Sequence, residues 1–393
     1  MKATQPAPQP LRILQVIGNA SQGGMETYIR NFIARLPPDQ FRLACICPYE
    51  SPFTTDLRAI GVEAVYVTPV ADDPLWRSIQ MTAEIIRHHQ IDVLHAHMPK
   101  AHLLAGLAGN LTHKPVVAQV HGMEVTAFEW SVARQTGSSM ITNCQQAYAQ
   151  ALALGAAPDR LTYIPNGVDT SRYASGKNST AFRELMGIPA DVPLIGFVGR
   201  LEHEKGADLF LPIADRLHRQ FPEAHFVMVG MGSLHAALLE QCKQMGLCEK
   251  LHFAGWVTNT TAVYPALDVL VQTTRSDGTS LVVLEAMASS CPVGALAVGG
   301  IPELVESGAT GVLAAPEDWH GLAGLIGCML QNKVRLREMG TAGRKRVEQH
   351  FDLRDTVART AAVLQRAAGS SPGNAAPETR FQSDPLMQPA TVT

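Results

Sequence analysis

Short apolar runs alternate with helix-forming segments along almost the whole chain, and this pattern limits the possible folds more than any other feature. The runs span residues 11–17, 41–47, 62–67, 91–97, 115–121 and 139–143, and a second series spans 193–199, 225–230, 251–256, 269–274 and 291–298. Apolar strands separated by helices are typical of parallel sheets covered on both faces. The sequence therefore predicts an α/β protein with two Rossmann-like, doubly wound domains that face each other across a cleft.

The chain has 393 residues, 46% of them apolar, which is enough to bury two separate cores. A polar, glycine-containing stretch at 170–180 interrupts the alternation and marks the boundary between the two series. We predict a flexible leader at 1–10, a first Rossmann-like domain at 11–172, a linker at 173–192, a second Rossmann-like domain at 193–350, a final helix at 351–367 and a disordered tail at 368–393.

Charge and cysteine content exclude several classes of protein. Lysine and arginine are scattered and the net charge is −3, so a nucleic-acid partner is not expected. The seven cysteines are odd in number and form no C-x-x-C pair, which indicates reduced cytosolic thiols. The apolar run at 11–17 is too short for a signal peptide, and no run approaches the roughly 18–20 residues of a membrane span. We expect a cytoplasmic protein, with shallow attachment to a membrane surface left open.

The glycines after the first apolar run have the spacing that begins a Walker A loop. Gly18 and Gly23 match that loop, but Gly24 and Met25 stand where it needs Lys and Ser or Thr. The chain therefore lacks the cation and the Mg²⁺ ligand of a P-loop ATPase or GTPase. Gly23 and Gly24 open a helix instead, and they either let the backbone approach a ligand closely or make a tight strand-to-helix turn.

Two cations follow the first apolar run of the second series. Arg200 and Lys205 share one loop, and Gly206 leads from it into a helix. Arginine binds phosphate bidentately and lysine adds a compact charge, so the pair predicts a diphosphate clamp after a strand. The alternative is a solvated pair of cations that Glu202 and Glu204 neutralise.

Several histidines lie near the ends of expected strands. His95 and His97 alternate in one strand and share a face, with His102 following, but no third metal ligand lies at suitable spacing and no D-x-D motif occurs. We interpret these three as structural histidines and predict no metal site. His121 stands at a strand end before Gly122, where its ring either points into the cleft or is a buried, hydrogen-bonded imidazole.

The stretch "RSDGTSLVVLEAMASSCPVG", which begins at Arg275, combines two carboxylates with a helix start. Asp277 and Glu285 are eight residues apart, and loop residues precede a helix expected at 280–288. The first turn of a helix suits an anion, whereas carboxylates are strong acceptors for sugar or ribose hydroxyls. A ligand with both phosphates and hydroxyls explains the combination, and the alternative for Asp277 is a helix cap.

Taken together, these motifs resemble the family 4 retaining glycosyltransferases of the GT-B fold, the glycosyl transferases group 1, from about residue 11 to 368. The family usually has Glu where this chain has Asp277, and Phe or Pro where it has "GTS", a difference that bears on which sugar is transferred. The matching segments are "SDGTSLVVLEAMASSCPVGALAVGGIPELVESGATGVL" with the E-x7-E region, "GGME" from Gly23, "HG" from His121, "PNGVD" from Pro165, "GRL" and "EKG" from Gly199 to Gly206, and "GMG" from Gly230.

The resemblance assigns roles to five side chains. It implies that Arg200 and Lys205 hold the donor diphosphate and that Glu285 holds the ribose hydroxyls. It also implies that Asp277 binds hydroxyls of the transferred sugar and that His121 lies beside the sugar ring. His121, Asp277, Arg200 and Lys205 are accordingly the candidate catalytic residues.

Backbone groups complete the implied donor site. The loop of Gly278, Thr279 and Ser280 would offer backbone N–H groups to phosphate oxygens at the helix start. Gly23 and Gly24 would approach the diphosphate from the first domain. The resemblance also implies that the final helix crosses back to the first domain, which would form the acceptor side, while the second domain would form the donor side.

The implied activity is metal-independent, retaining transfer of a sugar from a nucleotide-diphosphate sugar to a hydroxyl of a saccharide or lipid-linked acceptor. No cofactor is expected. Synthesis of cell-surface polysaccharide, lipopolysaccharide or glycolipid would suit such a protein, with peripheral contact at the inner membrane surface. Two alternatives are a sugar-nucleotide 2-epimerase of the same fold and a non-catalytic, sugar-nucleotide-binding partner subunit.

Overall fold

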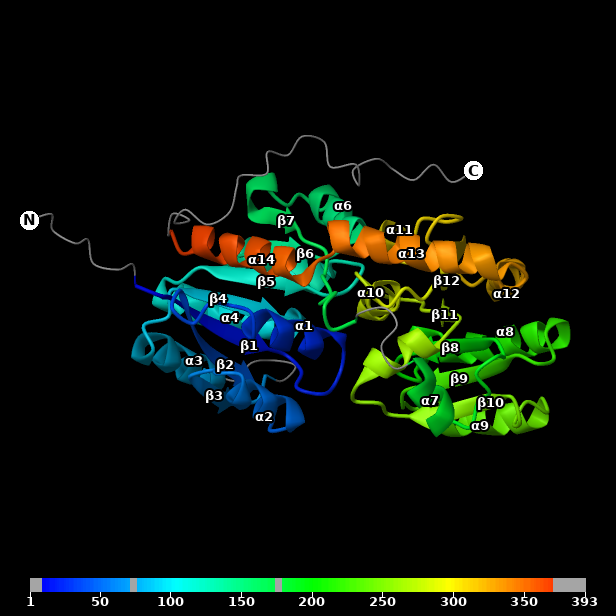
Figure 1. Cartoon of the computed structure of the whole chain (residues 1–393). Helices are drawn as coiled ribbons and strands as arrows, with labels where there is room; N and C mark the ends of the chain where they lie inside the picture. The colour runs from blue at the N-terminus through cyan, green and yellow to red at the C-terminus, as the bar shows by residue number, and fades with distance from the viewer. Residues whose placement is uncertain (1–8, 71–75, 174–178, 370–393) are drawn as a thin grey trace, which may run out of the picture. The chain divides into compact units, whose positions relative to one another are not determined.

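The computed structural model describes residues 9–70, 76–173 and 179–369, and this part of the chain forms two compact units. One unit comprises the chain up to Pro165 and resumes at Arg354, and the other runs from Asn166 to Leu353. Figure 1 labels the elements of both units. The leader expected at 1–10 lies outside the described residues as far as residue 8, and the expected tail does so from residue 370.

Within its described residues the first unit contains a seven-stranded sheet with the order β3-β2-β1-β4-β5-β6-β7, in which neighbouring strands are parallel. The order reverses between β1 and β4, as in doubly wound folds. Its strands are β1 (Leu11–Ile17), β2 (Phe41–Cys47), β3 (Ala64–Val67), β4 (Val93–His97), β5 (Val116–Val120), β6 (Ser139–Thr142) and β7 (Leu161–Tyr163).

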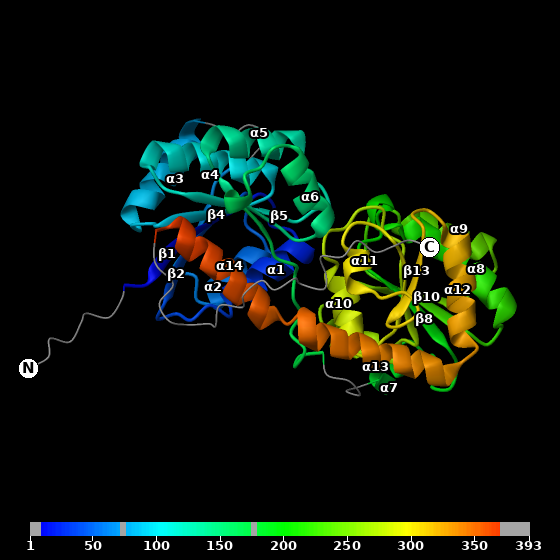
Figure 2. The same cartoon turned by 90° about the horizontal axis from the view of Figure 1, so that it is seen from above.

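Helices cover both faces of this sheet, with α3, α4 and α5 on one face in Figure 2 and α1, α2 and α14 on the other. Leu14, Val16, Ala96 and Leu104 are buried together between β1, β4 and α4. The helices are α1 (Gly24–Ile33), α2 (Pro52–Ala59), α3 (Trp76–His88), α4 (Pro99–Thr112), α5 (Ala127–Thr136), α6 (Gln145–Ala153) and, after the second unit, α14 (Leu353–Ala367).

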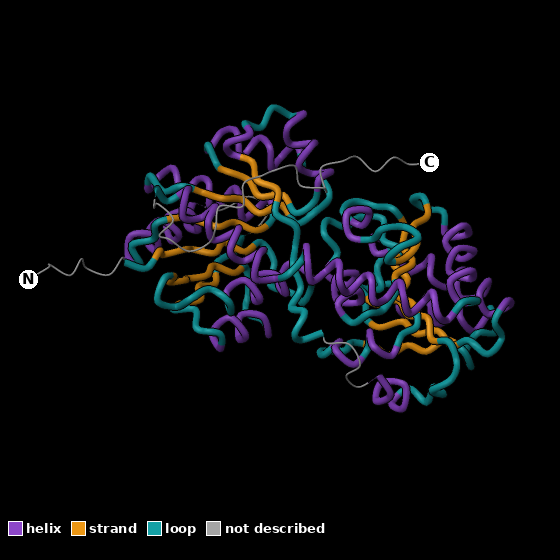
Figure 3. The backbone as a smooth tube through the Cα atoms, turned by 45° about the horizontal axis from the view of Figure 1, so that its top comes forward, coloured by secondary structure: helices purple, strands orange, loops and turns teal. Residues whose placement is uncertain are grey.

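The second unit repeats this plan. Its described strands form a six-stranded parallel sheet with the order β10-β9-β8-β11-β12-β13, and helices flank the strands in Figure 3. The strands are β8 (Leu194–Val198), β9 (His225–Val229), β10 (Leu251–Gly255), β11 (Val269–Gln272), β12 (Val293–Leu296) and β13 (Gly311–Ala314).

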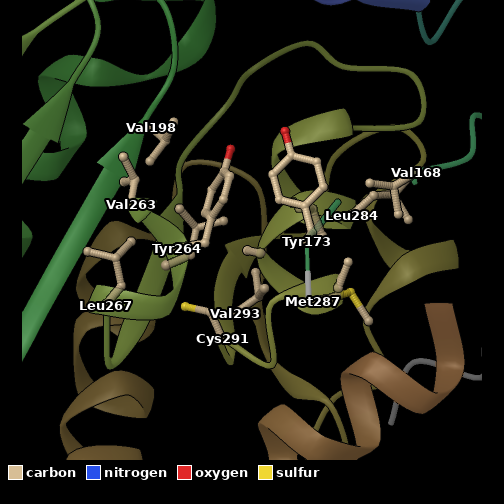
Figure 4. Close-up of a cluster of buried hydrophobic side chains, with 14 of the residues drawn as sticks. Val168, Tyr173, Val198, Val263, Tyr264, Leu267, Leu284, Met287, Cys291 and Val293 are labelled. Atoms are coloured by element: carbon tan, nitrogen blue, oxygen red, sulfur yellow. The ribbon is translucent and has the colours of Figure 1, made fainter. Parts of the chain in front are cut away.

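One core of the second unit gathers around Tyr264, which is fully buried, with Leu284 and Met287 of α10 (Figure 4). The helices are α7 (Ser179–Leu185), α8 (Ala207–Gln220), α9 (His235–Gln244), α10 (Leu281–Ala288), α11 (Ile301–Leu304), α12 (Trp319–Leu330) and α13 (Lys333–His350), with short 3-10 turns at η2 (His203–Lys205), η3 (Thr260–Ala262) and η4 (Tyr264–Ala266).

The α/β class and parallel sheets agree with the sequence analysis, whereas the linker expected at 173–192 differs from the structure. Helix α7 lies inside that range, and Phe182 and Ile188 are buried in the core of the second unit. Arg183 of α7 anchors the segment, because it donates to the backbone oxygen of Ala266 at 2.9 Å and to Asp268 at 2.8 Å. Polar residues marked this segment as a linker, but its buried side chains make it part of the second unit.

The chain leaves the first unit and re-enters it at neighbouring positions. Val168 donates from its backbone to Phe351 at 2.9 Å, and Leu353 donates back to Val168 at 3.1 Å. In the first unit Thr356 of α14 donates to the backbone oxygen of Pro165 at 3.0 Å. The unit boundary therefore falls after Pro165, earlier than the expected residue 172. Among the described helices, none combines the length and the apolar character needed to cross a bilayer.

Candidate active site

The candidate donor residues of the second unit gather where the strand order reverses. β8 and β11 are neighbours in the sheet although they are not consecutive in the sequence. Arg200 follows β8 by two residues, and Asp277 lies in the loop after β11. Ligands of doubly wound sheets bind beyond the carboxyl ends of the strands at such a switch point.

The loop after β8 packs directly on the end of β11, and this contact depends on a glycine. Gly206 has φ of +67°, and a Cβ atom there would lie 1.9 Å from the backbone oxygen of Thr273. The hydroxyl of Thr273 donates to the backbone oxygen of Gly206 at 2.7 Å. Only glycine combines the left-handed conformation with this approach, and the turn fixes Lys205 beside the β11 loop.

Lys205 is mostly buried and lies between three acceptors. Its Nζ donates to the backbone oxygen of Ser276 at 2.9 Å and lies 3.5 Å from Oδ2 of Asp277 and 3.5 Å from Oε1 of Glu204. The side chain of Lys205 is 18% exposed and that of Asp277 is 21% exposed. The structure thus brings together two side chains that are 72 positions apart in the sequence.

Arg200 lies at the rim of this group. Its side chain is 47% exposed, and its NH2 group lies 3.2 Å from Oε2 of Glu204. The two oxygens of Glu204 therefore face different cations, Arg200 and Lys205. Glu202 turns away and accepts from the backbone of Ser233 at 2.8 Å. Of the two carboxylates considered as neutralising partners, only Glu204 forms ion pairs with the two cations in the described chain.

Arg275, which the sequence analysis did not single out, ties these loops together. It binds Asp208 with two parallel hydrogen bonds of 2.7 and 2.8 Å, and its Nε lies 2.8 Å from Glu317. It also donates to the backbone oxygen of His203 at 2.7 Å, next to the Lys205 turn. No local signal could reveal this role, because the partners lie 67 and 42 positions away in the sequence.

Helix α10 begins immediately after the glycine-containing loop. Its N-cap is Ser280, whose side chain makes no capping hydrogen bond in the described structure. Asn166 fixes the approach to the helix by donating to the backbone oxygen of Thr279 at 2.9 Å, and Gly278 accepts from the backbone of Gly300 at 3.2 Å. Asp277 lies three positions before the N-cap, so the capping position itself belongs to Ser280.

The pKa of Asp277 reflects burial opposed by a cation. Burial raises the pKa of this carboxyl above its ordinary value, and the charge of Lys205 acts in the opposite direction. Desolvation disfavours the charged form, whereas a nearby cation favours it. Lys205 is therefore the cation that opposes the effect of burial on the pKa of Asp277.

Glu285 occupies the second turn of α10 and is held by hydroxyl groups. The hydroxyl of Tyr264 donates to Oε2 of Glu285 at 2.7 Å, and that of Thr260 does so at 3.5 Å. The Tyr173 hydroxyl lies 3.1 Å from Thr260, and Figure 4 shows the two tyrosine rings. Burial raises the pKa of Glu285, and the hydrogen bond from Tyr264 opposes that rise. Tyr264 thus engages one carboxylate oxygen of Glu285.

In the first unit the candidate histidine lies just after β5. His121 Nε2 is 2.9 Å from Nδ1 of His97 at the end of β4, and Nε2 of His97 is 2.7 Å from Oε1 of Gln15 in β1. Burial lowers the pKa of His121 to about 3 and that of His97 well below its ordinary value. The two rings are therefore neutral imidazoles at physiological pH.

The histidines interpreted as structural differ from one another. His97 has the hydrogen bonds of a satisfied core residue, whereas the ring nitrogens of His95 and His102 are buried without a partner among the described residues. Burial lowers the pKa of His95 to about 3 and that of His102 to about 4. Both remain uncharged, which limits the cost of burying them.

Gly23 and Gly24 lie at the start of α1. Gly23 is the N-cap and has extended backbone with φ of −168°, and a Cβ atom on it would lie 3.0 Å from Oε2 of Glu26. A Cβ atom on Gly24 would meet no atom within 4 Å. The backbone conformation requires glycine at neither position. Because no atom lies near the Cβ position of Gly24, that residue leaves open space at the helix start. In the described part of the chain no three His, Cys, Asp or Glu side chains gather as a metal site would need.

Comparison with known families identifies the family of this chain. The profile described as "Glycosyl transferases group 1" matches residues 178–346, and the one described as "Glycosyltransferase Family 4" matches residues 22–172. The chain belongs to the group 1 glycosyltransferases. The two matched segments coincide with the second sheet and most of the first, so the family assignment covers both units.

Individual relatives agree with this group 1 assignment. The chain is 29% identical over 211 residues to the lipopolysaccharide core biosynthesis mannosyltransferase LpsB of Rhizobium meliloti, an alignment that covers 52% of this chain and only 60% of that protein. It is 27% identical over 379 residues to a GDP-mannose-dependent monoacylated alpha-(1-6)-phosphatidylinositol monomannoside mannosyltransferase of Corynebacterium glutamicum, covering 87% of this chain and 94% of the relative.

A solved structure shows the same GT-B fold. The Anabaena protein Alr3699/HepE in complex with UDP has a TM-score of 0.80 and 21% sequence identity, and the match covers 91% of this chain and all of the other. The same Anabaena protein has also been solved with UDP-glucose. At this identity the likeness concerns the fold, and the ligands belong to the Anabaena protein.

Proposed function

We propose that this group 1 glycosyltransferase is a retaining enzyme that moves a sugar from a nucleotide-diphosphate sugar to a hydroxyl of a saccharide or lipid-linked acceptor. The observation that carries the proposal is the pairing of Lys205 with Asp277 at the strand switch point, directly before the first turn of α10. A cation, a carboxylate and a helix start together suit a ligand that carries both phosphates and hydroxyls.

The leaving group explains the cations. When the bond between the sugar and the diphosphate breaks, negative charge grows on the phosphate oxygens, and fixed cations stabilise it. Lys205 and Arg200 supply those charges in the proposed site, and both already hold an anion, the carboxylate of Glu204. The more highly charged diphosphate would displace Glu204, and the amides at the α10 start would bind further phosphate oxygens.

The two carboxylates would bind different parts of the donor. Glu285 would accept from the ribose hydroxyls with the oxygen that Tyr264 leaves free. Asp277 would accept from hydroxyls of the transferred sugar and would stabilise its growing positive charge as the phosphate departs. Because Asp277 is one methylene shorter than the family's usual Glu, the sugar would lie closer to the α10 loop. The cations replace a metal in this scheme, and no cofactor is required.

Cell-surface glycan or glycolipid synthesis is the proposed setting, supported by relatives named for lipopolysaccharide core and phosphatidylinositol mannoside chemistry. We place the protein in the cytoplasm with peripheral membrane contact. Leu107 and Leu111 of α4 are 39% and 45% exposed, and Leu111 lines a cavity of about 450 Å³ with Arg87 and Lys114. Apolar and cationic side chains together favour an anionic lipid surface. Leu111→Glu should then co-sediment less with phosphatidylglycerol vesicles than the parent protein does. Neutral vesicles should bind neither the parent nor the variant.

A donor screen followed by product analysis tests the catalytic proposal. UDP-, GDP-, ADP- and dTDP-sugars are compared by thermal shift, in which a ligand at 100 times its Kd stabilises the protein by roughly 2.7 kcal/mol. The shift should vanish in Lys205→Met. With the selected donor, NMR of the product should show the donor's anomeric configuration, and EDTA should leave the rate unchanged.

Other outcomes would reject the proposal in different ways. Conversion of the donor sugar without an acceptor would show an epimerase, and tight donor binding without turnover would show a partner subunit. An inverted anomeric product would remove the retaining mechanism. Loss of transfer in EDTA that Mg²⁺ or Mn²⁺ restores would remove the metal-independent mechanism.

A further inference from the structure

A buried chain of hydrogen bonds leads from the interior of the first sheet to His121. It begins at Gln15 in β1, passes through His97 in β4 and ends at His121 after β5, and these strands are adjacent in the sheet. Gln15 and His97 are completely buried. The rings of His97 and His121 thus lie at the carboxyl edge of the sheet, where ligands of such folds bind.

The amide of Gln15 determines which nitrogens of His97 and His121 carry protons. His97 is neutral because burial lowers its pKa, so it carries a single N–H group. The amide oxygen of Gln15, 2.7 Å away, accepts hydrogen bonds and cannot donate one, which places that N–H on Nε2 of His97. Nδ1 of His97 then has a lone pair, and the N–H group of the contact at 2.9 Å belongs to Nε2 of His121.

Packing holds the rings in this arrangement. The ring of Tyr28 lies edge-on to His121, with centroids 5.3 Å apart, and to His97, with centroids 6.3 Å apart. The Tyr28 hydroxyl is fixed in turn, since it lies 3.3 Å from the hydroxyl of Thr360 in α14 and donates to Gln119 at 3.4 Å. Rotation of either imidazole would therefore disturb a packed aromatic group as well as the hydrogen bonds.

We propose that His97, oriented by Gln15, is a positioning residue that fixes His121 as its Nε2–H tautomer, so that Nδ1 of His121 presents a lone pair to a sugar hydroxyl. This inference rests on the proposed function for the identity of the ligand. Nδ1 of His121 has no partner among the described residues, and it is not sealed from solvent as the ring nitrogens of His95 and His102 are.

The tautomer decides what His121 does in the reaction. With its N–H directed at His97, the neutral ring accepts a hydrogen bond from the ligand and has no proton to donate to it. His121 therefore orients a hydroxyl of its ligand, and protonation of the leaving group falls to other groups. The opposite tautomer would make His121 a hydrogen-bond donor to the ligand.

The tautomer is measured directly, without any assay of transfer. The full-length protein is labelled with 15N-histidine, two-bond proton–nitrogen correlations are recorded at pH 7, and the spectrum of His121→Asn assigns the His121 signals. We expect protonated Nε2 and unprotonated Nδ1 for His121. A protonated Nδ1, or rapid averaging of the two forms, would overturn the proposal, and rotation of the Gln15 amide would produce the first of these results.

Two substitutions of His97 provide a matched pair. The amide of His97→Asn places an acceptor near the position of Nδ1, whereas that of His97→Gln reaches toward Gln15 and leaves the Nε2–H group of His121 unpaired. We expect kcat/KM to fall about 10- to 100-fold in His97→Gln and to be largely retained in His97→Asn, with similar melting temperatures for the two.

Equal activities of His97→Asn and His97→Gln would show that His97 is only structural. The two hypotheses fail separately. If no donor supports transfer but His121 has the expected tautomer, the proposed function is wrong and the positioning role of His97 stands. If transfer proceeds and the tautomer differs, only the positioning role is wrong.

Discussion

Replacing Lys205 with Met tests whether the Lys205–Asp277 pair stabilises the fold in addition to its proposed role in binding the donor. The two charged groups are 3.5 Å apart, and their side chains are only 18% and 21% exposed. Two unit charges at this distance attract by about 5 kcal/mol at an effective dielectric constant of about 20. Desolvation offsets most of this attraction, so we expect a coupling energy of about 1–3 kcal/mol in a double-mutant cycle.

The direction of each change follows from the charges. Lys205→Met leaves Asp277 half-buried beside Glu204 without its cation, and we expect the unfolding free energy to fall by about 2 kcal/mol at pH 7. Adding Asp277→Asn removes the stranded charge and should restore most of that loss. Sugar transfer should not recover in the double variant, because it lacks the Lys205 charge just as Lys205→Met does. Loss of that charge should lower kcat by about 10²- to 10³-fold.

The pH dependence has a definite sign. Burial raises the pKa of Asp277, and Lys205 opposes the rise, so Lys205→Met should raise this pKa further. A carboxyl whose pKa is higher in the folded than in the unfolded state costs stability above that pKa, and the loss is recovered as the pH falls through it. The difference in unfolding free energy between the parent and Lys205→Met should therefore narrow as the pH is lowered from 7 through the pKa of Asp277 in the variant.

Calorimetry of the parent, both single variants and the double variant measures the coupling. The matched control is the pair Arg219–Asp215, which has a shorter distance of 2.7 Å but an arginine that is 77% exposed. Exposed pairs of this kind contribute less than about 1 kcal/mol. The reasoning is refuted if Lys205 and Asp277 couple no more strongly than the control, or if the second substitution restores transfer.

Three further predictions concern candidate donor residues in each of the two units. Tyr264→Phe removes the 2.7 Å hydrogen bond to Glu285, so the pKa of Glu285 should rise and the acid limb of donor binding should move to higher pH. An unchanged acid limb in calorimetric titrations would contradict the role of Glu285 in donor binding. Glu285→Gln should mainly raise the donor KM and Asp277→Asn should mainly lower kcat, with Asp277→Glu the mildest change; an Asp277→Asn enzyme that turns over normally and only melts earlier would show a purely structural Asp277. Gly206→Ala should lower the unfolding free energy by more than about 2 kcal/mol, because its Cβ atom would meet a backbone oxygen at φ of +67°. Gly24→Ala has open space for its Cβ atom, so it should leave the melting temperature unchanged and raise the donor KM.

Periodicity in the sequence was sufficient to predict both parallel sheets. The runs at 11–17 and 41–47 coincide with β1 and β2, and the helix expected at 280–288 is α10 within one residue. A buried parallel strand needs apolar residues on both faces, so its signature is local and readable. β7, which has only three residues, and β13 were not predicted as strands.

Segments whose role depends on distant partners were not readable in this way. The expected linker at 173–192 contains α7, which is fixed by the contacts of Arg183 with residues more than 80 positions away. Polar and glycine residues indicate a break in a local pattern, and they say nothing of burial against a distant core. Only the packed structure showed that this segment belongs to the second unit.

The candidate site divides in the same way. In the sequence, Arg200, Lys205 and His121 became candidates because they follow expected strands, whose carboxyl ends hold the ligands of such folds. Asp277 and Glu285 became candidates because they lie on either side of an expected helix start. Their partners came only from the tertiary structure. Tyr264 binds Glu285, Arg275 braces the Lys205 turn, and His97 contacts His121. Strand order and helix packing bring these groups together across tens of residues, so no local pattern could encode these pairings.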